Sequence, residues 1–214
     1  MIKVLEKLLN WIYIERCYFC HDSKEGKRLC SKCKSEIKTL PFQPSAVFYG
    51  CNIFSVSVYE GKMRELIKRV KYKHDKKLAK EQAEFMAKYW KNLGFFENFN
   101  VVPVPQHKKR LQQRHGNHMD IVGEEFCSTF DYTLLKDFVI RTKDTKPQYK
   151  LTKEEREENL KNAFKVNESK LEDKSAPILI IDDIKTTGAT LTEIITTLQK
   201  AGYTNIKALT TART

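Results

Sequence analysis

Apolar residues recur at helical spacing in several parts of the chain. Ile2, Leu5, Leu8 and Ile12 follow this spacing and predict a short amphipathic helix within Met1–Tyr13. The same pattern predicts four further helices, which lie between Gly61 and Val70, from Leu78 to Leu93, around Met119–Phe130, and around Leu191–Leu198. Gly94 directly follows one of these segments, Gly202 lies four residues after another, and both fit helix ends.

Runs of β-branched and aromatic residues alternate with these helices over most of the chain. They predict strands at Ala46–Tyr59, Val101–Val104, Thr133–Ile140, Pro177–Ile181 and Ile206–Thr211. Strands that are apolar on both faces and are separated by helices indicate a parallel sheet. The pattern therefore predicts an α/β fold, with a parallel sheet flanked by helices.

A change of character near Pro44 divides the chain. Pro41 and Pro44 interrupt any helix, and the strand-like sequence begins directly after them. We therefore expect an N-terminal helix and cysteine-rich module over residues 1–43 and a larger α/β domain over residues 44–214.

Length and composition fit one core with a small appendage. The chain has 214 residues, of which 41% are hydrophobic, and a formal net charge of +12. Its apolar stretches are short and interrupted by charges such as Lys3, Glu6 and Lys7, which argues against a membrane span or a secretory segment. A cytoplasmic protein is the simplest expectation.

Four of the six cysteines lie close together in the sequence. The spacing Cys17-x2-Cys20-x9-Cys30-x2-Cys33 presents two pairs of thiolates to one tetrahedral point. Zn²⁺ suits four sulfur ligands, and such a site is structural because no position is left open. An iron–sulfur cluster and reduced free thiols are the alternatives. We interpret His21 as a solvated loop residue, and Cys51 and Cys127 as small buried hydrophobes.

The strongest chemical signal is the segment ILIIDDIKTTGATL from Ile178 to Leu191. Its apolar strand ends in Asp182 and Asp183, at the edge of the sheet where open α/β folds bind ligands. A turn of small residues then leads into a helix, and its backbone N–H groups and hydroxyls can surround a phosphate. The turn consists of Thr186, Thr187, Gly188, Ala189 and Thr190.

Two carboxylates beside a phosphate site would repel the phosphate unless they serve another part of the ligand. They fit a site in which they accept hydrogen bonds from the hydroxyls of a ribose near a bridging cation. The alternative is an ordinary turn between a strand and a helix that is capped by aspartate.

The segment DDIKTTGAT resembles the loop of type I phosphoribosyltransferases that binds 5-phosphoribosyl 1-pyrophosphate (PRPP). Across nearly its full length, the chain is similar to the ComF family of competence proteins. The resemblance rests on the four cysteines, on Tyr59-Glu60-Gly61 with the following helix and Lys71, on the VPVP run at Val102–Pro105 with the basic loop after it, and on Arg141, Gln148, Arg156, Asn159 and Phe164.

The resemblance implies a role for each part of the loop. Asp182 and Asp183 would be the catalytic acid pair that holds the ribose hydroxyls of PRPP, and Thr186–Thr190 would surround its 5′-phosphate. Lys108, Arg110 and Arg114 would face the pyrophosphate, and Mg²⁺ would be held largely by oxygens of the substrate.

The chain departs from the family at one motif. It reads Arg114-His115-Gly116-Asn117-His118 where the family usually has Arg-Gly-Phe-Asn-Gln. Only Arg114 and Asn117 are therefore carried over.

A long polar stretch from Arg141 to Glu158 has no core face of its own. A segment of this kind inside a compact domain is usually functional. We expect a lid that carries Arg141, Gln148, Arg156 and Asn159. Alternatively, these residues fix the start of a helix.

Basic residues gather between Lys62 and Lys80, where nine of them occur. They form either a solvated helix face beside a pocket for a polyanion or a nucleic-acid surface. Tyr89 and Trp90 lie near this cluster at helical spacing, and we assign them to the core.

Two functions fit these features. The first is a PRPP-binding, phosphoribosyltransferase-like protein that acts in DNA uptake during natural transformation, with or without transfer to an unknown acceptor. The second is a non-catalytic adaptor that binds single-stranded DNA. In both cases the partners would include proteins of the DNA-uptake machinery.

Overall fold

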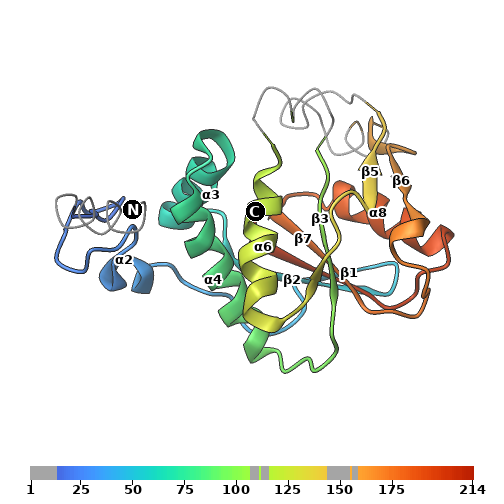
Figure 1. The fold of residues 1–214 in the computed structure, drawn as a ribbon, viewed down its shortest axis with the longest axis horizontal. Coiled ribbons are helices and arrows are strands. Elements are labelled where there is room, and N and C mark those ends of the chain that lie inside the picture. The colour runs from blue at the N-terminus through green and yellow to red at the C-terminus, as the bar shows by residue number, and fades with distance from the viewer. Residues whose placement is uncertain (1–13, 107–110, 112–115, 144–154, 156–158) are drawn as a thin grey trace, which may run out of the picture.

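The centre of the molecule is a six-stranded sheet in the order β1-β2-β8-β7-β3-β4. The computed structural model describes residues 14–106, 111, 116–143, 155 and 159–214 (Figure 1). The strands are β1 (Ala46–Phe48), β2 (Cys51–Val58), β3 (Asn100–Pro103), β4 (Thr133–Leu134), β7 (Ile178–Lys185) and β8 (Ile206–Arg213).

Only the β1–β2 pair of this sheet is antiparallel among the described residues, and the pairs β2–β8, β8–β7, β7–β3 and β3–β4 are parallel. The predicted fold class, an α/β domain built on a largely parallel sheet, is therefore confirmed. Because parallel strands all end at one edge, the carboxyl ends of β2, β3, β7 and β8 meet there.

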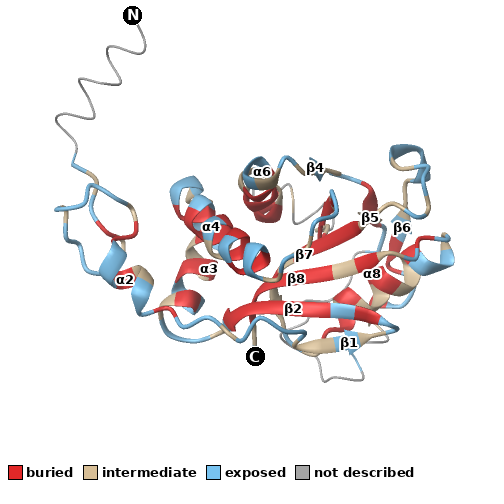
Figure 2. Cartoon of the chain, turned by 90° about the horizontal axis from the view of Figure 1, so that it is seen from below, coloured by how far each residue is buried: buried red, intermediate tan, exposed pale blue. Residues whose placement is uncertain are grey.

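The helices cover both faces of the sheet (Figure 2). They are α3 (Gly61–Lys73), α4 (Lys76–Asn92), α6 (His118–Phe130) and α8 (Ala189–Lys200), with α2 (Ser31–Ser35) in the cysteine-rich segment and a short 3₁₀ helix, η2, at Glu168–Lys170. Residues of α3, α4 and α6 share one apolar cluster with Leu179 and Ile181, and residues of α8 share another with Ile178 and Ile180. This alternation along β7 explains why the strand is apolar on both faces.

The predicted strand Thr133–Ile140 is wrong in one respect, because the structure divides it. Thr133–Leu134 joins the main sheet as β4, whereas β5 (Val139–Arg141) pairs with β6 (Phe164–Val166) in a separate two-stranded sheet. Asp137 lies between the two parts and has a left-handed backbone with φ 56°, which a continuous strand does not allow. The sequence pattern gave no separate signal for β6.

The other predicted elements are confirmed, with boundaries that differ by a few residues. Strand β7 continues through the acid pair to Lys185, and β8 continues to Arg213. Tyr89 and Trp90 of α4 are each 1% exposed and belong to the core, as predicted. The predicted helix in Met1–Tyr13 lies outside the described residues.

The cysteine-rich segment packs against α3 and α4 at one end of the molecule (Figure 2). Its Leu29 and Ile37 are buried in the same apolar cluster as those helices. Arg28 donates to Asp75 at the start of α4, with Nη2 2.8 Å from Oδ2. The division at residues 43 and 44 stays a prediction.

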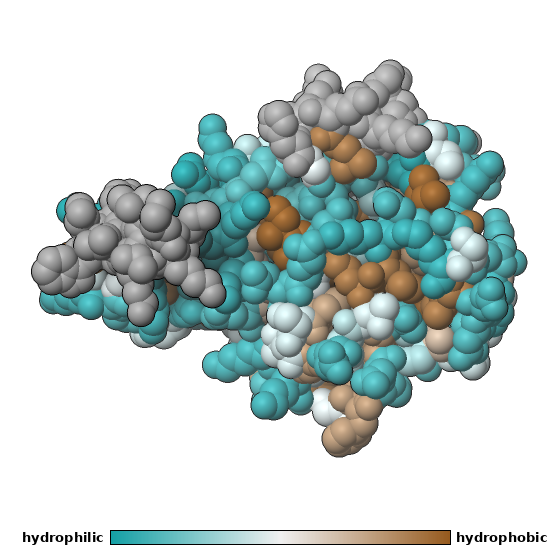
Figure 3. Space-filling view, in the orientation of Figure 1, coloured by the Kyte–Doolittle hydropathy of each residue, from teal (hydrophilic) through white to brown (hydrophobic). Residues whose placement is uncertain are grey.

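The surface is hydrophilic over most of the face seen in Figure 3, and hydrophobic residues gather near its middle, over the parallel strands. Among the described residues, no helix combines the length and the apolar character that crossing a lipid bilayer would require.

Candidate functional site

The candidate site begins where β7 reaches the carboxyl edge of the sheet. Four buried apolar residues, Ile178 to Ile181, fix the strand between its neighbours, and Asp182 and Asp183 follow at once. The Asp183 side chain is buried, whereas Asp182 is only partly covered. Strand β7 stays paired with β3 as far as Ile181 and with β8 as far as Lys185, so both acids lie just past the end of the β3 ladder. Their role as ligand-binding residues stays a prediction.

Two other elements bring partners to Asp183. Lys71 of α3 places its Nζ 2.6 Å from Asp183 Oδ2, and His118 at the start of α6 places its Nε2 2.9 Å from the same oxygen. Both partners therefore contact the same oxygen of Asp183, Oδ2.

The two carboxyl groups have opposite pKa shifts. Burial would raise the pKa of Asp183, but the positive charge of Lys71 and the bond from His118 hold it below its usual range. Burial and then the negative charge of Asp183 raise the pKa of Asp182 to about 8. The pair therefore carries close to one negative charge near neutral pH, rather than two.

The turn after β7 is tight and has a left-handed backbone at its glycine, as its run of small residues predicts. Gly188 has φ 85° and precedes α8, so glycine is required by the backbone. A Cβ built on Gly188 would lie 2.4 Å from Cε2 of Phe48 in β1, because the ring of Phe48 covers this glycine. Thr186 is exposed, and the hydroxyl of Thr187 accepts weakly from the backbone N–H of Ala189 at 3.4 Å.

The start of α6 brings together Asn117, which the sequence predicted, and two polar residues that the sequence reasoning missed, Gln106 and His118. Asn117 is the N-cap of α6, where its Oδ1 accepts from the backbone N–H of Met119. Gln106 Nε2 lies 3.0 Å from His118 Nδ1 and 3.3 Å from Asn117 Oδ1. Gln106 lies three residues after the end of β3, so the rule that ligands bind at carboxyl edges was the signal that could have found it.

The remaining predicted ligands of the site are only partly described. Lys108, Arg110 and Arg114, which were expected to face the pyrophosphate, lie outside the described residues, as do Gln148 and Arg156 of the expected lid.

Two residues of the expected lid are described. Arg141 is 7% exposed in β5, and its guanidinium carbon lies 5.6 Å from the centre of the Phe164 ring. Asn159 is partly covered. The lid itself stays a prediction.

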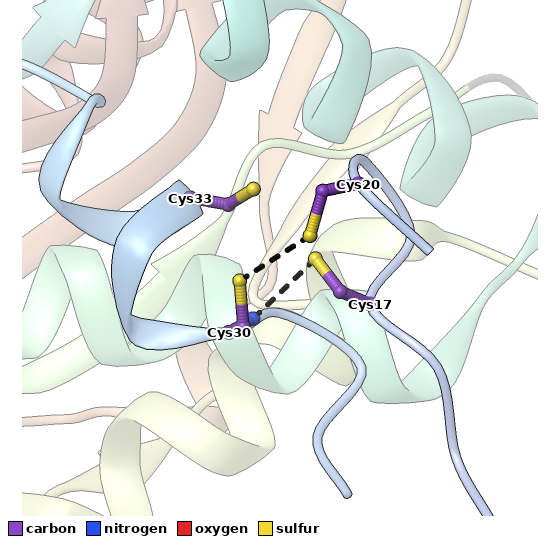
Figure 4. Close-up of side chains that lie close together, drawn as sticks. All are labelled: Cys17, Cys20, Cys30 and Cys33. Atoms are coloured by element: carbon purple, nitrogen blue, oxygen red, sulfur yellow. Dashed lines mark hydrogen bonds between the residues drawn. The ribbon is translucent and has the colours of Figure 1, made fainter. Parts of the chain in front are cut away.

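The four N-terminal cysteines converge on one point (Figure 4). Their Sγ atoms all lie within 4.8 Å of one another, and those of Cys20 and Cys30 are 3.6 Å apart. A tetrahedron with Zn–S bonds of about 2.3 Å has sulfur atoms about 3.8 Å apart, so the cluster has nearly the dimensions of a zinc site. The arrangement can hold a metal ion such as zinc, and the donor set of four sulfurs favours zinc over Mg²⁺ or Ca²⁺.

Neighbouring groups support this cluster. The Nζ of Lys62, from α3, lies 3.2 Å from Cys33 Sγ and 2.6 Å from Glu36. Burial would raise the pKa of the Cys17 thiol, but backbone N–H groups lower it to about 6. A bound dication with four thiolates has a net negative charge, so a lysine beside one sulfur is a favourable neighbour.

The other two cysteines are buried, as predicted. Cys51 and Cys127 are 3% and 6% exposed. Burial raises the pKa of each thiol to about 12, so both are protonated at neutral pH. They behave as small hydrophobic residues rather than as ligands.

These features define a class: an α/β protein with an acid pair and a glycine turn at the carboxyl edge of a parallel sheet, joined to a four-thiol cluster. The chain is 30% identical to competence protein F of Haemophilus influenzae over 92% of its own length and 96% of that protein. The chain belongs to the competence protein F family. The predicted ComF resemblance is thereby confirmed.

More distant relatives carry a different name. The chain is 30% identical to the DNA utilization protein YhgH of Escherichia coli K12 over 53% of its length, and it spans about half, 49%, of that protein. No protein-family profile matches the chain.

The similar solved structures are phosphoribosyltransferases. The adenine phosphoribosyl transferase of Trypanosoma brucei covers 75% of this chain and 83% of its own, with 11% identity and a TM-score of 0.45. The hypoxanthine phosphoribosyl transferase of Trypanosoma cruzi covers 71% and 64%, with 16% identity and a TM-score of 0.34.

Proposed function

We propose that the protein binds PRPP together with Mg²⁺ at the carboxyl edge of β7 and acts in DNA uptake during natural transformation. The observation that carries the proposal is the acid pair of Asp182 and Asp183, followed within one turn by the left-handed Gly188 at the start of α8. Acids suit the hydroxyls of a sugar, and the backbone N–H groups at the start of a helix suit its phosphate.

In this proposal each part of the chain contacts a different part of the ligand. Asp182 and Asp183 Oδ1 accept hydrogen bonds from the ribose hydroxyls. Backbone N–H groups and hydroxyls of Thr186–Thr190 donate to the 5′-phosphate, where charge-assisted bonds are worth about 1.5–3 kcal/mol each. Lys108, Arg110 and Arg114 are proposed to face the pyrophosphate.

The residues present fit a hydrated magnesium ion, because Asp182 can offer a carboxylate oxygen beside the ligand and Mg²⁺ needs few protein ligands. When bound, the ion neutralises charge on the pyrophosphate. Transfer of the phosphoribosyl group would require an acceptor facing C1′, and the chain's residues do not identify one. Positioning of the sugar and cations at the leaving group would then supply the catalysis.

Calorimetry of PRPP with Mg²⁺ tests the pocket. We expect wild-type protein to bind and Asp182→Asn to lose binding, while Asp173→Asn, which changes an exposed acid, retains the wild-type affinity. Equal affinity in wild type and Asp182→Asn would refute the assignment. Release of pyrophosphate in the presence of candidate acceptors then separates a transferase from a binder.

The role in DNA uptake is supported by family membership, since the relatives are named as a competence protein and as DNA utilization proteins. We propose a cytoplasmic location, where the described cysteines stay reduced, and contacts with proteins of the uptake machinery. The transformation frequency of a strain that carries Asp182→Asn tests this role. A transformation frequency equal to that of wild type would show that DNA uptake does not require this pocket.

A second candidate is a non-catalytic adaptor that binds single-stranded DNA. The observation in its favour is a set of cations on α3 and at the start of α4, where Arg64, Lys73 and Lys76 form no ion pair with any described residue. Replacing these three by Gln should lower the magnitude of the slope of log K against log salt concentration by about 2, because each phosphate contact contributes about 0.7 to that slope. Lys88, Lys91 and Lys200 replaced by Gln form the control, and absence of binding at low salt would remove this candidate.

A further inference from the structure

The orientation of Asn117 is fixed by its neighbours and provides the starting point. Its Oδ1 accepts from the backbone N–H of Met119 at 3.2 Å, and its Nδ2 donates to the backbone oxygen of Val104 at 3.2 Å and to Asp120 at 3.0 Å. A backbone N–H can only donate, and a backbone oxygen can only accept. The oxygen of the Asn117 amide therefore faces Gln106.

The amide of Gln106 is then fixed as well. Because Asn117 Oδ1 is an acceptor, the Gln106 atom 3.3 Å away from it must be the nitrogen. That nitrogen also lies 3.0 Å from His118 Nδ1, which must offer a lone pair to receive its hydrogen. Nδ1 of His118 is therefore unprotonated.

The opposite side of the imidazole faces an acceptor. His118 Nε2 lies 2.9 Å from Asp183 Oδ2, which is also 2.6 Å from the Lys71 ammonium. A carboxylate that is paired with a lysine accepts hydrogen bonds, so Nε2 carries the hydrogen. His118 and Asp183 are 3% and 5% exposed, and water has little access to either.

We propose that His118 is a positioning residue, held as the neutral Nε2–H tautomer, that fixes the carboxylate of Asp183 and joins the carboxyl end of β7 to the segment after β3 through Gln106 and Asn117. The inference rests on the proposed function, because it assigns different tasks to the two acids of that site. Lys71 and His118 hold Asp183 through Oδ2, so the carboxylate of Asp183 has one fixed orientation, whereas neither residue makes such a contact with Asp182.

This division of tasks has a physical reason. A carboxylate that rotates about χ2 must lose that freedom when it binds a sugar hydroxyl, whereas one that is already fixed at one oxygen does not. The network spans β7, α3 and α6, so the position of Asp183 is set by three elements of the fold.

The tautomer is tested on the wild-type chain without ligand. Nitrogen-15 shifts of the imidazoles distinguish protonated from unprotonated ring nitrogens, and His118→Gln assigns the His118 signals. We expect a protonated Nε2 and an unprotonated Nδ1 at neutral pH. A doubly protonated ring or the Nδ1–H tautomer would overturn the inference.

The positioning role is tested by the affinity for PRPP with Mg²⁺ in three variants. Gln can donate to Asp183 and accept from Gln106, whereas Phe fills the space without either bond. We expect His118→Gln to stay within a few-fold of wild type, and His118→Phe and His118→Ala to lose about tenfold or more, the value of one charge-assisted bond. Equal affinity in the Gln and Phe variants would mean that His118 only fills space, and would overturn the positioning role.

The two tests separate this inference from the proposed function. If wild-type protein does not bind PRPP, the proposed function fails, and the nitrogen shifts still report whether the tautomer is as argued. If wild type binds and the Phe variant binds equally well, the proposed function stands and the positioning role fails. Thermal unfolding of each variant identifies any loss of affinity that comes from loss of the fold.

Discussion

At the scale of single residues, the most informative pair is Asp182 and Asp183, because adjacent carboxyl groups in one strand have opposite pKa shifts. Lys71 and His118 stabilise the charge on Asp183, while Asp182 has no such partner among the described residues. A charged Asp182 therefore costs free energy in the folded state. Carboxyl groups whose charged form is destabilised by the fold are common at binding sites, where a bound ligand can lower the free energy of the charged form.

Asp182→Asn should stabilise the protein at neutral and alkaline pH. The pKa of Asp182 is about 8 in the folded state, against an ordinary value of about 3.9 when unfolded. Between these values the folded state binds more protons, so the stability of wild type falls as pH rises, and the variant does not share this loss. At pH 8 we expect a gain of about 1 kcal/mol or more, which is about 2–4 °C in Tm for a chain of this size.

Thermal melts of both proteins from pH 4.5 to pH 8 measure this difference. The gain should shrink toward the acidic end, and the Asn side chain can still accept the bond from the Asp183 N–H that Asp182 Oδ1 accepts now. A constant difference across the range would contradict the raised pKa. A stabilised variant would also show that loss of PRPP binding is not loss of folding.

Gly188→Ala should destabilise the protein for two separable reasons. The backbone at φ 85° is strained for alanine, at about 1–3 kcal/mol, and the new Cβ would lie 2.4 Å from the Phe48 ring. Combining it with Phe48→Ala removes the clash and leaves the strain. In a double-mutant cycle by urea unfolding, we expect the double variant to be at least about 1 kcal/mol more stable than the sum of the single changes predicts. Additivity within about 0.5 kcal/mol would show that Phe48 does not press on this glycine.

At the scale of elements, Asp75 joins the cysteine-rich segment to α4. Its Oδ1 accepts from the backbone N–H of Leu78 as the N-cap of the helix, and its Oδ2 accepts from Arg28. One side chain therefore caps the start of a helix and connects two parts of the chain.

Asp75→Ala should lower the free energy of unfolding by about 2 kcal/mol, because a cap is worth about 1 kcal/mol and the partly exposed ion pair contributes up to about 1 more. Asp75→Asn is the matched control, because asparagine caps helices equally well and lacks the charge. Urea unfolding should place it between wild type and the Ala variant. Equal losses in both variants would mean that the cap contributes nothing here.

Most elements of the fold could be predicted from their periodicity, since α3, α4, α6 and α8 each bury one stripe and β7 and β8 are apolar on both faces. The division between β4 and β5 could not, because it depends on one left-handed residue, Asp137. Strand β6 is three residues long and is defined by its partner β5 rather than by its own pattern.

The acid pair and the glycine turn could be predicted because they are contiguous in the sequence and each residue type has a local reason. Lys71 was among the residues that carry the resemblance to the family. Its contact with Asp183 could not be predicted, because the two residues are 112 positions apart in the sequence. The role of His118 depends on where α6 begins relative to β7, and no local sequence pattern predicts that distance.

At the scale of the whole molecule, the cysteine-rich segment with α2 lies at one end, away from β7, which carries the acid pair (Figures 1 and 2). The segment around the cysteines is too short to bury a large core of its own. Metal binding can supply the missing folding free energy in such modules.

Cys30→Ala combined with Cys33→Ala should abolish metal binding and lower Tm or solubility, while the affinity for PRPP with Mg²⁺ stays close to that of wild type. Metal analysis, melting and calorimetry measure the three effects. The double variant is preferable to a chelator, which would also remove Mg²⁺ from the ligand. Cys51→Ala combined with Cys127→Ala is the control that should keep the metal. Wild-type protein purified without zinc would contradict the assignment of this site.

The position of β8 in the sheet has a consequence for synthesis. This strand spans Ile206–Arg213, yet it lies between β2, which is made about 150 residues earlier, and β7. Because a ribosome releases a chain from its N-terminus onward, β2 lacks its parallel neighbour until Ile206–Arg213 has been made. During that interval its buried face and unpaired edge are open to other chains, and we expect nascent fragments that lack β8 to require chaperones.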